Sequence, residues 1–233
     1  MRLFAIGDLH LSFAVEKKMD LFPGWKNYEE KLEKNWRMDI KKQDWVVLAG
    51  DTSWGMNFAE CLQDFQFIHA LPGKKLIMKG NHDYWWASIK KNKAFWSDYG
   101  LNSLDLLRNN AFLFGEIGIC GTKGWICGPM ATEGDQKIIR RESLRLETSI
   151  KAGLELGANE LIVFLHYPPL GKEHGNDILN VLHKYKSIIT ACYYGHLHGD
   201  AIDTAFNGVY DDILFRLISA DNLNFAPLLI TAI

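Results

Sequence analysis

Residues that can bind metal ions or move protons stand directly after several short apolar runs of the sequence. These residues are Asp8, His10, Asp51, Asn81, His82, Asp83, His166, His196 and His198. Carboxylate, amide and imidazole groups without thiolates suit Mn, Fe, Zn or Co better than Ca or a structural zinc. The set is larger than one metal ion needs. A bridging carboxylate would divide it between two ions, as in two-metal hydrolases.

Two pairs within this set share the same close spacing. Asp8 and His10 are two residues apart, and His196 and His198 repeat that separation. An extended backbone points side chains at i and i+2 to the same side. We therefore expect each pair to act together at one site.

The apolar runs that precede these residues must form the elements that position them. Their shortness and β-branched content are typical of buried strands. The runs are Leu3–Ile6, Trp45–Ala49, Leu76–Met78, Leu161–Leu165 and Ile188–Tyr194. Because ligands bind at the carboxyl ends of strands in open α/β sheets, we expect these runs to deliver their polar residues to one edge.

Helical patterns separate the predicted strands. They cover Tyr28–Lys42, Phe58–Ala70, Trp85–Tyr99 and Gln136–Leu156. The runs Ala111–Phe114 and Ile117–Cys120 predict a further strand pair, and residues 208–233 predict terminal strands around an Asp-Asn turn. Strands that alternate with helices indicate an α/β fold with largely parallel pairing. The length of 233 residues suits a single domain over 1–233.

Composition narrows the class of protein. With 48% apolar residues the chain can bury a sizeable core, and a net charge of −2 argues against nucleic acid as a partner. The four cysteines form no CxxC pair, which favours a reduced, cytoplasmic protein. We also expect no membrane association, because no stretch approaches 18 consecutive apolar residues.

Not every histidine belongs to this pattern. His69, His174 and His183 stand in no such cluster, and we expect them to be ordinary core or surface residues. Each glycine before a site residue could also be a simple turn glycine. Five of the eight histidines at predicted strand ends, each beside a glycine or proline turn, are much harder to explain in this way.

The ordered motifs resemble those of the calcineurin-like metallophosphoesterase superfamily. The pattern Asp-x-His, Gly-Asp, Gly-Asn-His-Asp, a later His and Gly-His-x-His runs from Asp8 to His198. The segments Gly80–Trp86 and Gly124–Cys127 are similar to those of a group of small bacterial predicted phosphohydrolases. One departure concerns the second motif, which in the family reads Gly-Asp-x-x-Asp, because Trp54 stands here in place of the second acid.

The resemblance implies a fold and a set of roles. The fold would be a four-layer αββα sandwich of two mixed β-sheets flanked by helices. One metal ion would be held by Asp8, His10 and His198, and the other by Asn81, His166 and His196. Asp51 would bridge the two ions, and His82, oriented by Asp83, would act outside the coordination shell. The cofactors would be two divalent ions, with Mn favoured over Fe, Zn or Co.

These roles predict hydrolysis of a phosphate mono- or diester in a phosphorylated small molecule. A metal-bridging hydroxide would attack in line, since two metal ions lower the pKa of bound water and neutralise phosphoryl charge. His82 would assist the leaving group, a role worth about 10²–10⁴ in rate. The alternatives are a non-catalytic protein-binding scaffold of the same fold and a nuclease. The presence of His82 argues against the scaffold, and the acidic balance argues against the nuclease.

Candidate substrate contacts come from two regions. The predicted helix Gln136–Leu156 begins near Asp135, a common N-cap type, and carries Arg140 and Arg141 in its first turns. Cations there oppose the helix dipole, and an anionic substrate would offset the cost. Trp125 in the preceding loop and Trp85 after the Gly-Asn-His-Asp motif could supply an apolar wall. The alternative is that the arginines pair with nearby acids and the tryptophans belong to the core.

Overall fold

The computed structural model describes residues 1–126, 132–170 and 176–233, and within them the chain forms two compact units. Unit 1 comprises Met1–Leu106 together with Ser219–Ile233, and unit 2 comprises Leu107–Ile218. Each unit is built on one mixed β-sheet. The single-domain organisation over 1–233 stays a prediction.

Unit 1 contains a five-stranded sheet with the order β11-β1-β2-β3-β4. Its strands are β1 (Arg2–Ile6), β2 (Trp45–Leu48), β3 (Lys74–Ile77), β4 (Leu104–Leu106) and β11 (Leu228–Ala232). Strands β1 to β4 are parallel to one another, and β11 pairs antiparallel with β1. The carboxyl ends of β1, β2 and β3 therefore meet at one edge of this sheet, as predicted from the sequence.

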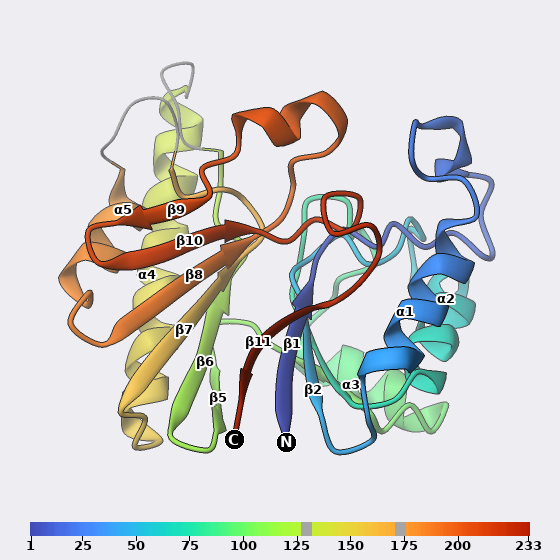
Figure 1. Cartoon of the computed structure of the whole chain (residues 1–233), viewed down its shortest axis with the longest axis horizontal. Coiled ribbons are helices and arrows are strands. Elements are labelled where there is room, and N and C mark those ends of the chain that lie inside the picture. The colour runs from blue at the N-terminus through green and yellow to red at the C-terminus, as the bar shows by residue number, and fades with distance from the viewer. Residues whose placement is uncertain (127–131, 171–175) are drawn as a thin grey trace. The chain divides into compact units, whose positions relative to one another are not determined.

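Three α-helices lie on one face of this sheet (Figure 1). They are α1 (Tyr28–Asp39), α2 (Phe58–Ala70) and α3 (Ile89–Asp98), and a short 3₁₀ helix, η1 (Met19–Leu21), precedes them. Leu32, Trp36 and Ile40, spaced four residues apart along α1 and at its C-cap, are buried in the core of the unit. Helix α3 begins four residues later than predicted, because Ser88 caps it by accepting a hydrogen bond from the Lys91 amide.

Unit 2 contains a six-stranded sheet with the order β5-β6-β7-β8-β10-β9. Its strands are β5 (Ala111–Phe114), β6 (Ile117–Thr122), β7 (Glu160–Leu165), β8 (Ile189–Tyr194), β9 (Gly208–Tyr210) and β10 (Ile213–Leu217). The four central strands are parallel, whereas β5 and β9 pair antiparallel at the two edges. The predicted pairing of Ala111–Phe114 with Ile117–Cys120 is confirmed.

Helices α4 (Glu133–Glu155) and α5 (Asp177–Lys184) lie on one face of the second sheet, and η2 (Gly199–Thr204) follows β8 (Figure 1). Helix α4 buries the apolar residues Ile139, Leu146 and Ile150. Helix α5 was not predicted. Its eight residues are too short for a clear helical period, although Asn176 caps it by accepting from the Leu179 amide.

The C-terminal strands divide between the two sheets, which the sequence did not indicate. Strands β9 and β10 form a hairpin whose turn residues, Asp211 and Asp212, both have positive φ. After the predicted turn at Asp221 and Asn222, the chain continues to β11 in unit 1. There the amino group of Met1 donates to the carbonyl of Ile233 at 2.7 Å.

The two mixed sheets flanked by helices confirm the predicted α/β fold class. In the described ranges, no helix has both the length and the apolar character needed to cross a bilayer. Cys61, Cys120 and Cys192 are buried and unbridged, and Cys127 lies outside the described residues, as does His174.

Candidate functional site

Two loops of unit 1 bring predicted metal ligands together. Asp8 and His10 follow β1, and Asp51 follows β2; the three are 0%, 3% and 1% exposed. A carboxylate oxygen of Asp8 lies within 4.8 Å of one on Asp51 and of a ring nitrogen of His10. The His10 Nε2 to Asp51 Oδ2 distance is 3.9 Å. Two buried carboxylates this close favour a bound cation, because burial and like charge both penalise their ionised forms.

The backbone of these residues lies in the left-handed region, where L side chains are uncommon. The φ angles are 60° for Asp8, 47° for His10 and 50° for Asp51. Two hydrogen bonds fix the conformation: the Asp8 amide donates to Gly50 O and the His10 amide to Asp51 O, both at 2.9 Å. The predicted extended geometry for Asp8 and His10 is therefore wrong. Residues held in this region often mark functional sites.

The Gly-Asn-His-Asp motif joins the same cluster through backbone contacts. A Cβ at Gly80 would overlap Oδ1 and the backbone nitrogen of Asp51, so that only glycine allows this approach. The carboxylate of Asp83 accepts from the amides of Asp51 at 2.8 Å, Gly80 at 2.7 Å and Thr52 at 2.9 Å. Asp83 thus ties the Asp51 loop to the Gly80 loop. Its predicted role in orienting the His82 ring stays a prediction.

The ring of His82 lies among aromatic neighbours. Its backbone amide donates to Asp51 Oδ1 at 2.7 Å. Its ring centroid is 5.8 Å from that of His10 and 4.5 Å from that of Trp54. The structure therefore places His82 beside the predicted ligands of unit 1. The prediction named Trp54 only as a departure from the family motif and did not count it among the site residues.

Unit 2 brings two of its predicted ligands together. His166 follows β7 and is 0% exposed, and His196 follows β8 with a φ of 76°. Their ring centroids are 5.2 Å apart, and the Gly195 amide donates to His166 O at 3.1 Å. His198 is half-buried and extended, with φ −129° and ψ 158°, so its backbone does not repeat that of His10.

Trp125 lies in the same part of unit 2 as these histidines. Its ring centroid is 5.4 Å from that of Tyr167, which in turn is 4.2 Å from that of His196. The ammonium of Lys123 lies 4.1 Å from the Trp125 ring centroid and 5.5 Å from that of Tyr167. Tyr167 was not among the predicted site residues, although it stands next to the predicted ligand His166.

The start of helix α4 differs from the prediction. Thr132, not Asp135, is the N-cap, and the two side chains form a capping box. Asp135 also accepts from the indole of Trp125 at 2.8 Å, and these bonds lower the pKa of its carboxyl. Arg140 and Arg141 are exposed and lie beyond the first turn, so the helix dipole gives less reason for an anionic ligand than we expected.

Nearby acids have partners other than these arginines. Glu142 pairs with Arg145 at 2.6 Å, and Glu147 pairs with Lys184 at 2.7 Å. Hydrogen bonds from Lys184 first, and then from Tyr185 and Lys151, lower the pKa of the Glu147 carboxyl to about 2. The alternative that Arg140 and Arg141 serve these particular acids is therefore weakened.

Trp85 is a core residue. It is 4% exposed, and its ring packs edge-on against Phe65 with centroids 4.8 Å apart. Its indole nitrogen donates to Asp83 Oδ1 at 3.0 Å. This burial favours the alternative that Trp85 belongs to the core, and its contact with substrate stays a prediction.

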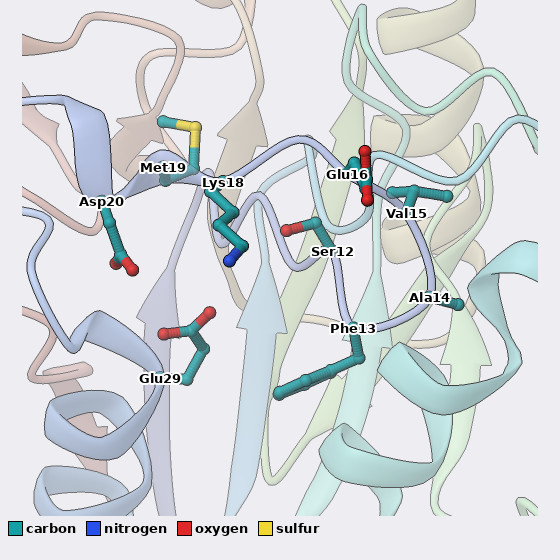
Figure 2. Close-up of a pocket in the computed structure, with 9 residues that line it drawn as sticks. All are labelled: Ser12, Phe13, Ala14, Val15, Glu16, Lys18, Met19, Asp20 and Glu29. Carbon is teal, nitrogen blue, oxygen red and sulfur yellow. The ribbon is translucent and has the colours of Figure 1, made fainter.

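A pocket that the sequence did not indicate follows the Asp8-His10 loop in unit 1. It has a volume of about 390 Å³ and is lined by Ser12, Phe13, Ala14, Val15, Glu16, Lys18, Met19, Asp20 and Glu29 (Figure 2). In Figure 2 the loop Ser12–Asp20 curves around it, with Glu29 of α1 facing the loop. Burial raises the pKa of the Glu29 carboxyl, and the nearby charge of Asp20 adds to the effect.

Comparison with a solved structure above a TM-score of 0.5 shows that the fold is shared with a distant protein. TT1561 of Thermus thermophilus matches with a TM-score of 0.53 at 14% identity, over 84% of this chain and 82% of that one. AQ665 of Aquifex aeolicus, a protein of unknown function, has a TM-score of 0.47 at 15% identity, over 98% and 95% of the two chains. The purple acid phosphatase PPD1 of yellow lupin has a TM-score of 0.49 at 14% identity; the match covers all of this chain and 45% of that one.

The family is identified by sequence. No curated protein matched the chain. The family model described as calcineurin-like phosphoesterase matches residues 1–200, which include every predicted metal ligand. The chain therefore belongs to the calcineurin-like phosphoesterase family.

Proposed function

We propose that the protein is a metal-dependent phosphoric ester hydrolase that acts on a phosphorylated small molecule, as a phosphatase or a phosphodiesterase. The observation that carries the proposal is the cluster in unit 1. Two buried carboxylates, those of Asp8 and Asp51, lie within 4.8 Å of each other beside His10, and His82 borders them. Family membership supports the same reaction class.

The donor set fits the two metal ions on which the family depends. Buried carboxylates and imidazoles bind Mn, Fe, Zn or Co well, and we favour Mn. In this proposal Asp8, His10 and His198 would hold one ion and Asn81, His166 and His196 the other, and Asp51 would contribute to both. Three buried cysteines without disulfides support a cytoplasmic location, which we also propose.

When bound, two divalent ions lower the pKa of coordinated water and offset the charge that develops on the phosphoryl oxygens, which makes in-line attack feasible at neutral pH. The side chains of the protein supply the other functions. His82 protonates the leaving oxygen, and the bond from its amide to Asp51 keeps its backbone in register with the metal-binding loop. Asp83 holds the loops of Asp51 and Gly80 together.

Substrate recognition belongs to unit 2 in this proposal. Lys123 and Trp125 present a cation against an aromatic face, and Tyr167 links that face to His196. Arg140 and Arg141 are exposed on α4 and would contact a phosphate or its leaving group. An anionic ester with an organic leaving group matches both the cations and the aromatic face.

The test is hydrolysis with and without metal. Protein stripped with a chelator and checked by elemental analysis is assayed on bis-p-nitrophenyl phosphate, p-nitrophenyl phosphate, cyclic nucleotides and dinucleotide polyphosphates. We expect no turnover until Mn²⁺ is added, and then turnover of at least one ester. Full activity in the metal-free protein would refute the proposal, and so would inactivity on every ester in protein that binds metal.

A further inference from the structure

Trp54 brings one indole ring against two imidazoles of unit 1. Its ring centroid lies 4.8 Å from that of His10, with the planes 22° apart, so the two rings are stacked. It lies 4.5 Å from that of His82, with the planes 51° apart. One side chain therefore contacts both the proposed metal ligand and the proposed proton donor.

The backbone of Trp54 is itself firmly held. Its amide donates to Leu11 O at 2.9 Å, immediately after His10, and Leu11 forms a parallel bridge with Ser53. The hydroxyl of Ser53 donates to Asp64 and accepts from the Gly55 amide at 3.1 Å. These bonds on both sides of Trp54 leave its backbone little freedom.

The indole is also in contact with a cation. The ammonium of Lys17 lies 4.7 Å from the centroid of the Trp54 ring, a distance typical of a cation–π contact. The indole is half-buried and contacts this cation as well as the imidazoles. A ring restrained by its backbone and by these contacts can restrain the rings that pack against it.

We propose that Trp54 is a positioning residue that fixes the ring planes of His10 and His82. The inference rests on the proposed function of those two histidines. A metal-binding imidazole must point one ring nitrogen at the metal ion, and a proton-donating imidazole must point one at the leaving group. Supporting groups outside the site commonly fix such ring orientations. The family motif has an acid at this place, but a carboxylate has no face on which an imidazole can stack. Trp54 supplies that face.

The first experiment measures ring motion without relying on turnover. Protein labelled with ¹³C at histidine Cε1 is incubated with Zn²⁺, and His10→Gln and His82→Gln variants assign the two resonances. In the parent protein we expect order parameters near the rigid value of about 0.85 for both rings. Trp54→Ala should lower them toward about 0.6, and Trp54→Phe should retain the parent values because it keeps a ring.

Trp45 provides the matched control. It is a half-buried tryptophan of unit 1 with the ammonium of Lys74 4.3 Å from its ring centroid, and it stands at the start of β2, whereas Asp51 follows the end of that strand. Trp45→Ala should leave the order parameters of His10 and His82 unchanged. Unchanged order parameters in Trp54→Ala, or an equal loss in Trp45→Ala, would overturn the inference. If Trp54→Ala does not fold, Trp54→Ser and Trp54→Leu, which also remove the ring, replace it.

The second experiment separates positioning from substrate binding. On bis-p-nitrophenyl phosphate with Mn²⁺, Trp54→Ala should lower kcat by roughly 10–100-fold, the usual effect of losing an outer supporting group, with KM nearly unchanged. Trp54→Phe should recover most of kcat. A rise in KM alone, or equal losses in the Phe and Ala variants, would contradict the inference. If the parent protein hydrolyses no ester, the proposed function fails, while the order parameters still decide the role of Trp54.

Discussion

Unit 1 buries far more charge than unit 2. Among the described residues, the buried acids and lysines of unit 1 are Asp8, Asp44, Asp51, Asp64, Lys75 and Asp83, whereas unit 2 has Glu142 alone. The proposed ligands divide in the same way. Unit 1 offers two carboxylates together with His10 and Asn81, and unit 2 offers three imidazoles.

This difference shows that unit 1 supplies the negative charge that would compensate the positive charge of a metal ion. A buried carboxylate favours a cation strongly, because its own burial is costly, whereas a neutral imidazole adds a lone pair without adding charge. We therefore expect substitutions in unit 1 to change metal affinity more than substitutions of the histidines in unit 2.

The largest effect should come from Asp51→Asn. Because the variant removes the shared negative charge, we expect it to bind Mn²⁺ more than about 100-fold more weakly and to lose at least about 1,000-fold in kcat/KM. His196→Gln should lose less affinity. Isothermal titration with Mn²⁺ and elemental analysis measure the difference.

Asp44→Asn is the control, because Asp44 is also a buried aspartate of unit 1 but pairs with Arg2 at 2.7 Å. It should lower stability and keep the metal. If His196→Gln loses as much affinity as Asp51→Asn, the proposed division of charge between the units is wrong.

His82→Ala should lower kcat by about 10²–10⁴ while retaining both metal ions, since it removes a proton donor and no ligand. His69→Ala serves as the control, because His69 lies in the same unit and hydrogen-bonds to Ser103 at 2.9 Å. Its kcat should stay close to that of the parent protein. A fall in the metal content of His82→Ala would instead assign His82 to the coordination shell.

A third effect concerns the pH dependence of stability. Lys75 is fully buried, and burial lowers the pKa of its ammonium from 10.5 to about 7. The lysine binds its proton more tightly in the unfolded chain than in the folded protein. The contribution of Lys75 to the free energy of unfolding is therefore largest above pH 10.5, and it is lost as the pH falls to 7. Metal-free protein should gain up to about 1.4 kcal/mol per pH unit from Lys75 above pH 7.

Urea unfolding at several pH values tests this against Lys75→Met. The variant keeps an apolar side chain of similar length and should lose this part of the pH slope. Glu142→Gln, at the buried acid of unit 2, should leave the slope between pH 7 and 9 unchanged. Identical slopes for the parent and Lys75→Met would show that Lys75 stays protonated in the folded protein.

The smallest effect should come from Arg140→Ala and Arg141→Ala. Both side chains are exposed, so a contact with substrate is worth about 1 kcal/mol, or roughly fivefold in KM. The rise in KM should be larger for a natural-sized substrate, such as a dinucleotide polyphosphate, than for p-nitrophenyl phosphate. Equal effects on both esters, or a change confined to thermal stability, would remove these arginines from the substrate site.

The sequence predicted what depends on local pattern. The strands before Asp8, Asp51 and Asn81 were located to within two residues at each end, because continuous apolar runs are typical of strands buried on both faces. Glycine and proline turns marked where those strands end. The same signals located β7 and β8 in unit 2.

The features of the fold and of the site that were not predicted depend on tertiary contacts, which no local sequence pattern contains. The division of the C-terminal strands between two sheets is a matter of long-range pairing, such as that of β11 with β1. The burial of Trp85 follows from its contact with Phe65 on α2. Similarly, the extended geometry expected for Asp8 and His10 was wrong, because both residues have positive φ and donate their amides to carbonyls of the neighbouring loop, those of Gly50 and Asp51.

Those positive φ angles have a consequence for how the protein can change in evolution. Left-handed backbone costs about 1–3 kcal/mol for a side-chain-bearing residue, and glycine relieves much of that cost. Asp8→Gly should therefore raise the melting temperature of metal-free protein while removing a ligand, whereas Asp98→Gly, at the last residue of α3, should lower it. If a duplicated gene were no longer under selection for activity, this one mutation would make its protein both inactive and more stable. Such a copy would have little tendency to regain its site, because restoring Asp8 would lower the stability again.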